Sequence, residues 1–137
     1  MLSHTAEYAL RAALYLAEHG RGRLVQVGEI AEALDIPRNY LSKILHALTR
    51  QGVLRSTRGK SGGFQLARRP DGLYLVQVVG PFGSLGEKRH CLLGRAQCTD
   101  RAPCAAHARW KEVADRMAIF FRETTLAELV GGAVIAA

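Results

Sequence analysis

The chain has 137 residues, of which 48% are hydrophobic and 23% charged, and its formal net charge is +7. This composition is typical of a globular domain and excludes a disordered chain. No stretch approaches the roughly 20 apolar residues of a membrane-spanning helix. The first 20 residues are periodic and carry charges throughout, unlike a secretory signal. We therefore expect a cytoplasmic protein with no membrane partner.

The positive charge is concentrated in one block. Residues 36–70 include eight Lys and Arg residues and no Asp or Glu, whereas the rest of the chain has 11 basic and 12 acidic residues. A concentrated basic block indicates a polyanionic partner, because clustered cations attract phosphates. The alternative interpretation is a solvated basic face on an unrelated fold.

The first predicted helix covers residues 4–19, where apolar residues recur at helical spacing. Ser3 is placed to cap its first turn. A glycine-rich segment ends it, and residues 24–27 are predicted to be a short extended stretch. The helix and this stretch precede the basic block.

Two shorter helices are predicted next, at about 28–34 and from Pro37 to about Gln51. The turn between them is Asp35-Ile36-Pro37, and Pro37 suits a first helical position because its missing N–H costs nothing there. Gly52 is placed to cap the second of the two helices. Two short helices across a tight turn indicate a helix-turn-helix.

A basic β-hairpin is predicted to follow, because short alternating runs at 53–58 and 64–68 flank a glycine-rich turn. Such a hairpin completes a winged helix-turn-helix that binds double-stranded DNA. Arg58 and Lys60 lie at its tip, where Arg58 is suited to a narrow minor groove.

The third helix is predicted to enter the major groove, since one helix fits there. Arg38 can donate to guanine and Asn39 can pair with adenine, whereas Ser42 is short and less selective. Lys43 and Arg50 are expected to hold phosphates and so to set register.

Tyr40 has two open roles in this helix. It either contacts a phosphate or packs the helix against the rest of the domain.

A long helix is predicted at 106–123 and a short capped helix at 124–130, after a short strand or helix start at 73–79. The long helix has more apolar surface than one small domain easily covers. A two-fold dimer through it would bury that surface and space two recognition helices one DNA turn apart.

Three cysteines, Cys91, Cys98 and Cys104, lie in a polar loop at 87–105, and His107 follows the last of them after two residues. Thiolates suit iron–sulfur clusters and zinc, and the nearby Lys and Arg residues would offset an anionic cluster. Structural zinc with three Cys ligands and one His is an alternative, as are cysteines packed as small apolar residues.

The chain resembles the IscR/NsrR type of bacterial transcription regulators, the Rrf2 superfamily, over essentially its whole length. The similarity lies in five features: Glu7 to Ala12, Tyr40-Leu41, the glycines of the predicted wing, the three cysteines, and Thr125 to Leu129. It implies a homodimer with one iron–sulfur cluster per subunit, of two-iron two-sulfur or four-iron four-sulfur type. The state of that cluster would set operator affinity.

The resemblance also implies roles for single residues. Base contacts map onto Asn39, Tyr40 and Ser42, and a minor-groove arginine maps onto Arg58.

For the cluster, the resemblance implies the three cysteines and a fourth ligand. That ligand is His107 or, delivered from the partner subunit, Glu7. Without a ligand role, His107 would be a solvent-exposed residue in the first turn of a helix. Glu7 would then form a surface ion pair with Arg11.

The sequence therefore predicts a mainly α fold with a small β-hairpin wing and a long C-terminal dimerisation helix. Residues 1–80 would form the winged helix-turn-helix domain, 81–105 the cluster-binding loop, and 106–137 the dimerisation helix and tail. No arrangement of catalytic residues or phosphate-binding loop indicates an enzyme, so no small-molecule substrate is expected. We expect a transcription regulator that acts as a repressor. The rivals are a zinc-stabilised structural or partner-binding module and a metal-free thiol-redox regulator.

Overall fold

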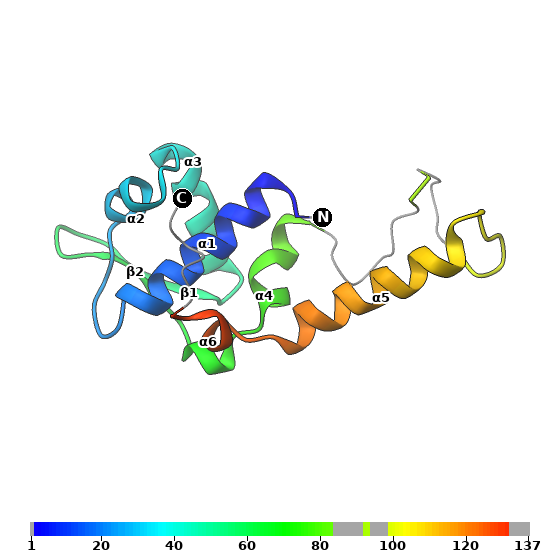
Figure 1. Cartoon of the computed structure of the whole chain (residues 1–137). Helices are drawn as coiled ribbons and strands as arrows, with labels where there is room; N and C mark the ends of the chain where they lie inside the picture. The colour runs from blue at the N-terminus through cyan, green and yellow to red at the C-terminus, as the bar shows by residue number, and fades with distance from the viewer. Residues whose placement is uncertain (1, 84–91, 94–98, 132–137) are drawn as a thin grey trace.

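The computed structural model describes residues 2–83, 92–93 and 99–131. In this part of the chain the fold is mainly α-helical with one two-stranded antiparallel hairpin, which confirms the predicted fold class (Figure 1). The helices and strands, with η for 3-10 turns, are α1 (His4–His19), α2 (Val27–Leu34), α3 (Arg38–Arg50), β1 (Leu54–Thr57), β2 (Gly63–Leu66), η1 (Pro70–Gly72), α4 (Leu75–Val79), η2 (Gly80–Phe82), α5 (His107–Glu123) and α6 (Leu126–Leu129).

Helix α1 is the centre of the core, in contact with α2, α3, α4 and α6. Its buried side is rich in small residues, which let the other helices approach closely: Ala6, Ala9, Ala12, Ala13 and Ala17. The predicted cap is confirmed, since the backbone N–H of Ala6 donates to the Ser3 hydroxyl at 3.1 Å. One capped helix therefore supports α2, α3, α4 and α6.

The helix-turn-helix is formed by α2 and α3. Asp35 ends α2 in a left-handed conformation, with φ 53° and ψ 51°, which Asp tolerates better than most residues. The predicted apolar face of α3 is buried: Leu41, Ile44, Leu45 and Leu48. Pro37 lies one residue before the helix, at the N-cap, rather than at its first position. The predicted boundary was thus one residue early.

The wing is a three-part structure. Strands β1 and β2 pair from Leu54↔Leu66 to Thr57↔Gly63. Val25 adds an antiparallel bridge to Phe64, with N–H···O distances of 2.9 and 2.8 Å in the two directions. The predicted extended stretch at 24–27 is thus reduced to Val25, because α2 already begins at Val27. This bridge fixes the wing to the start of the helix-turn-helix.

The C-terminal helices differ in how they pack. Leu126 of α6 is fully buried against the domain core, and Tyr74 bridges to Thr125 just before it. Helix α5 projects away from the domain and approaches it near α4, where Phe121 is buried (Figure 1). In the segment 73–79, predicted as a strand or a helix start, Leu75–Val79 form α4 and Tyr74 is its N-cap. None of the helices in the described ranges is long and apolar enough to cross a membrane.

Candidate DNA-binding surface and cysteine loop

The solvent-facing side of α3 contains the residues expected to contact DNA. Arg38, Asn39, Lys43 and Arg50 are exposed, and Ser42 is partly exposed. They are available because the opposite side of the helix is buried in the core. This side of α3 can therefore enter a groove without unfolding any part of the domain.

Tyr40 packs against α1. Its hydroxyl group forms a hydrogen bond with the Thr5 hydroxyl, and its ring lies edge-on to the Tyr8 ring at 5.8 Å between centroids. Of the two roles considered for Tyr40, the structure contains the packing contact. The side chain is still 38% exposed.

The hairpin tip exposes Arg58 and Lys60 and depends on two glycines. A Cβ at Gly62 would lie 2.1 Å from the Thr57 carbonyl oxygen, and one at Gly63 would lie 2.6 Å from that of Val25. Both distances are far below van der Waals contact. Backbone of Thr57 and Val25 thus passes so close to Gly62 and Gly63 that these positions require glycine.

Two side chains fix the wing relative to the helix-turn-helix. The Gln26 amide, at the N-cap of α2, donates to the Lys60 carbonyl oxygen at 3.1 Å. The His46 ring of α3 lies edge-on to the Phe64 ring of β2, at 5.4 Å between centroids. The recognition helix and the wing are therefore held as one surface.

A polar network joins α1 to α2. Glu29 accepts from both terminal nitrogens of Arg23, at 3.0 and 2.8 Å, and from the Tyr15 hydroxyl at 2.6 Å. The hydrogen bonds from Arg23 and then Tyr15 lower the pKa of Glu29 to about 2. Burial and the Glu29 carboxylate raise the pKa of Tyr15. The network fixes the position of α2 and so of the turn into α3.

The start of α5 brings together two of the expected cluster ligands. Cys104 is half-buried, and its carbonyl oxygen accepts the His107 N–H at 3.1 Å. His107 is only 7% exposed, and its Nε2 lies 2.8 Å from Oδ1 of Asp100. The alternative to a ligand role, a solvent-exposed His107, is therefore wrong, because the ring is buried. Cys91 and Cys98 lie outside the described residues.

Glu7 is exposed on α1. Among the residues that the structure describes, no ion pair joins the Glu7 carboxylate to Arg11. The Arg11 guanidinium instead donates to the Leu34 carbonyl oxygen at 3.0 Å and lies 5.9 Å from the Tyr8 ring centroid. The carboxylate of Glu7 thus faces solvent on the same turn that contacts Tyr40.

Within the described ranges, no three His, Cys, Asp or Glu side chains form a group that could hold a metal ion. Two of the four expected ligands are outside those ranges. His107 nevertheless has one feature of a metal-binding histidine, because such a histidine usually has its second nitrogen bonded to a carboxylate, as His107 has to Asp100.

A family model described as "Iron-dependent Transcriptional regulator", Rrf2, matches residues 2–132. The chain belongs to the Rrf2 family. The resemblance noted in the sequence is thereby confirmed, and the protein is a DNA-binding transcriptional regulator rather than an enzyme.

Relatives within the Rrf2 family extend this result. A candidate HTH-type transcriptional regulator of Aquifex aeolicus (strain VF5) is 39% identical over 132 residues, covering 95% of this chain and 91% of the relative. The HTH-type transcriptional regulator IscR of Vibrio atlanticus (strain LGP32) is 28% identical, covering 94% of this chain and 74% of the relative.

Solved structures have the same fold at low identity. T. potens IscR has a TM-score of 0.74 at 22% identity, covering 94% of this chain and 85% of its own. CymR, the global cysteine regulator of B. subtilis, has a TM-score of 0.74 at 23% identity, covering 94% of this chain and 95% of its own. These likenesses confirm the winged-helix architecture.

Sequence reasoning about this Rrf2 regulator missed three supporting residues. Gln26 and Asp100 are polar residues that belong to no distinctive sequence pattern. Gln26 bonds to Lys60, which is distant in sequence, and Asp100 bonds to His107 across a turn. Thr5 is likewise an ordinary residue of a helix first turn, yet it bonds the recognition helix. Spacing alone contains no signal for such contacts.

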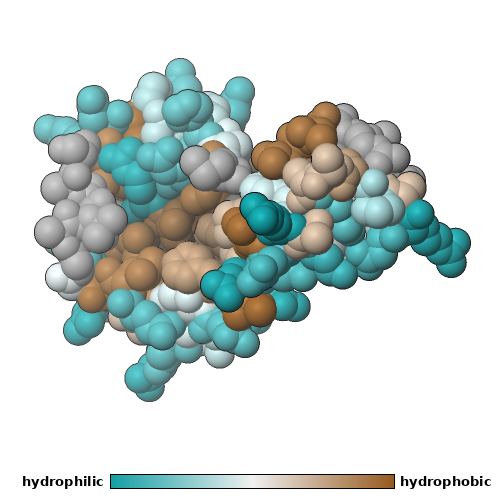
Figure 2. Space-filling view, turned by 45° about the vertical axis from the view of Figure 1, so that its right-hand side comes forward, coloured by the Kyte–Doolittle hydropathy of each residue, from teal (hydrophilic) through white to brown (hydrophobic). Residues whose placement is uncertain are grey.

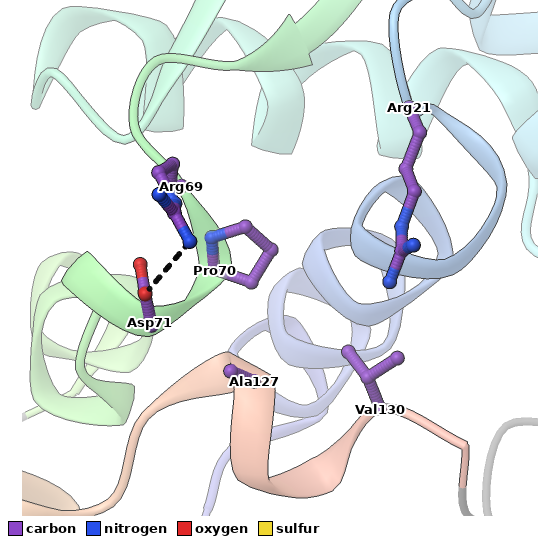
Figure 3. A pocket seen from close by; sticks show the side chains of 6 residues that line it. All are labelled: Arg21, Arg69, Pro70, Asp71, Ala127 and Val130. Carbon is purple, nitrogen blue, oxygen red and sulfur yellow. Dashed lines mark ion pairs between the residues drawn. The ribbon is translucent and has the colours of Figure 1, made fainter.

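The Rrf2 domain also has an open hollow of about 220 Å³ between the end of α1, η1 and α6 (Figure 3). Arg69 pairs there with Asp71 at 3.3 Å, and Arg21 extends toward Val130. No residue of α3 or of the hairpin tip lines this hollow. It is therefore separate from the surface expected to bind DNA.

Proposed function

We propose that this protein is a dimeric repressor whose affinity for its operator is set by an iron–sulfur cluster. Each subunit would hold one cluster, with Cys91, Cys98, Cys104 and His107 as its ligands. The observation that carries the proposal is the buried His107 ring, bonded to Asp100 at 2.8 Å and one turn from Cys104. A buried, carboxylate-oriented histidine beside a cysteine has the features of a metal ligand.

The residues present would perform distinct parts of this task. Three thiolates suit iron–sulfur clusters, and the imidazole would complete the set. When bound, the cluster would supply iron that can change its oxidation state or bind small ligands. Asp100 would hold the His107 ring in place, and Lys111, at 3.2 Å from Asp100, would hold the carboxylate. Glu7, exposed on α1, is the alternative fourth ligand, contributed to the partner subunit.

DNA reading is proposed for the exposed side of α3 and for the wing. Arg38 and Asn39 would contact base edges and Ser42 would assist, since each projects from the N-terminal half of α3. Lys43 and Arg50 would hold phosphates.

In the wing, Arg58 would enter the minor groove and Lys60 would contact the backbone. Tyr40 is proposed to act mainly through its contacts with α1, while its exposed part remains near the DNA. Because DNA is its partner, we place the protein in the cytoplasm.

Dimerisation is proposed through α5. Along one side of this helix, Trp110, Val113, Met117 and Phe120 recur at helical spacing, and Val113 and Phe120 are each 49% exposed. Figure 2 shows hydrophobic surface where the projecting helix meets the domain. Exposed apolar surface on a projecting helix favours pairing with a second copy, in a two-fold arrangement. Residues 1–80, 81–105 and 106–137 would then be the DNA-binding, cluster-binding and dimerisation regions.

The proposal is tested by purifying the protein without oxygen and measuring iron, sulfide and visible absorbance. A cluster gives coloured protein with iron and sulfide in equal amounts. Colourless protein with one zinc per chain would support the structural-zinc alternative. Metal-free protein whose DNA affinity changes on thiol oxidation would support the redox alternative.

Single Cys→Ala substitutions at 91, 98 and 104 should each remove the colour, because three thiolates leave no redundancy. Thr99→Ala, beside Cys98, is the matched control and should keep it. If all three cysteine variants kept both their metal and wild-type operator affinity, the sensing proposal would fail, whereas DNA binding would remain.

A further inference from the structure

We propose that the first turn of α1 positions Tyr40, and with it the N-terminal end of α3 that is proposed to contact bases. A second part of the proposal is that Ser3 couples this turn of α1 to the segment that leads into the cysteine loop. The inference deepens the proposed function, on which its regulatory part rests. It makes Ser3, Thr5 and Tyr8 positioning residues that do not themselves touch DNA.

The first link joins α1 to α3. Tyr40 is the third residue of α3 and follows Asn39, one of the residues proposed to contact bases. Its hydroxyl group is bonded to Thr5, and its ring packs edge-on against Tyr8. An edge-to-face pair and a hydrogen bond together fix both the position and the rotation of the phenol. The direction of the neighbouring Asn39 therefore depends on where the first turn of α1 lies.

The second link joins α1 to the end of η2. The Ser3 hydroxyl group donates to the Phe82 carbonyl oxygen at 3.1 Å and accepts the Ala6 N–H at 3.1 Å. A single hydroxyl therefore caps α1 and fastens it to a residue 79 positions away. Phe82 is followed by one glycine and then by the segment that contains the cysteines. A displacement of Phe82 would therefore reach the α1 cap through this hydrogen bond.

The contacts of the two links are suited to small movements. They are hydrogen bonds and ring contacts at the edge of the domain, whereas the rest of α3 is held by fully buried Leu41, Ile44 and Leu45. Close-packed interiors resist displacement, and peripheral polar contacts rearrange at less cost. A shift of the α1 cap would therefore redirect the first turn of α3 without repacking the core.

The opposing hypothesis is that Tyr40 acts by bonding DNA. The two hypotheses differ in whether affinity for DNA depends on Thr5. We compare wild type, Thr5→Val, Tyr40→Phe and the double variant for binding to DNA selected from a random library by the wild-type protein. Each single variant should bind about three- to ten-fold more weakly, the loss expected for one hydrogen bond. The double variant should be no weaker than either single one, because both remove the same bond.

Two results would overturn the first link. Thr5→Val with wild-type affinity beside a weakened Tyr40→Phe would assign the hydroxyl to DNA. Additive losses in the double variant would show that the two groups act separately. Backbone amide exchange in the metal-free protein provides a readout independent of any cluster. It should accelerate at Leu41, whose N–H donates to the Pro37 carbonyl oxygen at 2.9 Å, in both single variants and remain unchanged around Leu48.

The second link is tested by Ser3→Asp. An aspartate at the N-cap still accepts the Ala6 N–H, so α1 and thermal stability are preserved, but it cannot donate to Phe82. The variant should keep the visible absorbance of wild type while the ratio of operator affinities between cluster-loaded and cluster-free protein falls toward one. A ratio equal to that of wild type would overturn the coupling.

Failure of the proposed function is distinguishable from failure of this inference. A wild-type protein without a cluster, or with equal affinity in both forms, would contradict cluster control and the coupling through Ser3. The Thr5–Tyr40 link would still be decided by the double variant and by amide exchange, which need no cluster.

Discussion

Nε2 of His107 lies 2.8 Å from Oδ1 of Asp100. The His107 ring is almost completely buried, whereas the Asp100 carboxylate is exposed. Asp100→Ala should weaken cluster retention about 10- to 100-fold, the usual loss when the partner of a metal-binding histidine is removed. Retention is measured as loss of visible absorbance in the presence of an iron chelator. Glu112→Gln, which removes an exposed carboxylate of α5 that pairs with Arg116 at 3.3 Å, is the control. Equal losses in both variants would mean that charge near the loop, not orientation of His107, is what matters.

The close approach of Gly63 to Val25 predicts a wing defect. Gly63→Ala places a methyl group 2.6 Å from the Val25 carbonyl oxygen, at a φ of 154°, so the Val25–Phe64 bridge must break or shift. We expect a loss of about 1–3 kcal/mol in the free energy of unfolding and weaker DNA binding. Gly72→Ala, where a Cβ meets nothing within 4 Å, should change neither. Chemical denaturation and DNA titration measure the two effects, and an unaltered Gly63→Ala protein would refute the steric argument.

The Glu29 network predicts a pH-dependent stability. The pKa of Glu29 is lowered from 4.5 to about 2, so its bonds to Arg23 and Tyr15 stabilise the folded state above pH 4.5. That stabilisation is lost as the pH falls from 4.5 toward 2, because the carboxylate must then be protonated. Since the pair is largely exposed, Glu29→Gln should cost roughly 1 kcal/mol or less at pH 7.

Thermal unfolding at pH 7 and at pH 2.5 measures the difference between Glu29→Gln and wild type. The difference should be smaller at the lower pH. A difference that stays constant would show that the carboxylate charge does not contribute. Glu112→Gln, which breaks the exposed pair with Arg116, is the matched control.

The exposed side of α5 predicts how the protein assembles. Val113 and Phe120 lie two turns apart on one side, whereas Ile119, also exposed at 43%, is turned by about 100° from Phe120. Phe120→Glu should therefore produce monomers and weaken operator binding, while Ile119→Glu should not. Sedimentation at micromolar concentration distinguishes the two. A wild-type monomer in both the cluster-free and cluster-loaded forms would contradict the dimer.

The elements of the fold were largely predictable because their determinants are local. Helical spacing defined α1, α3 and α5, and the glycine-rich basic turn defined the hairpin. Boundaries were less accurate, as at Pro37, since an N-cap and a first helical position differ only in backbone conformation. The bridge from Val25 to Phe64 was not predicted, because it joins segments that no local pattern relates.

The candidate site was predictable in type but not in detail. The chemistry of Asn39 or Cys104 follows from residue type and place in the chain. The hydrogen bond of His107 to Asp100 and that of Tyr40 to Thr5 do not follow from residue type. Both partners are common polar residues that gain a role only from the tertiary fold.

The central claim is tested most directly by measuring the affinity of cluster-loaded and cluster-free protein for the same selected DNA duplex, at two salt concentrations. We predict that the two forms differ at least several-fold. For both, affinity should fall steeply as salt rises, because the basic residues between 36 and 70 displace counterions from the DNA. Arg58→Ala should weaken both forms. Affinities that are equal with and without the cluster, and unchanged between low and moderate salt, would contradict the account.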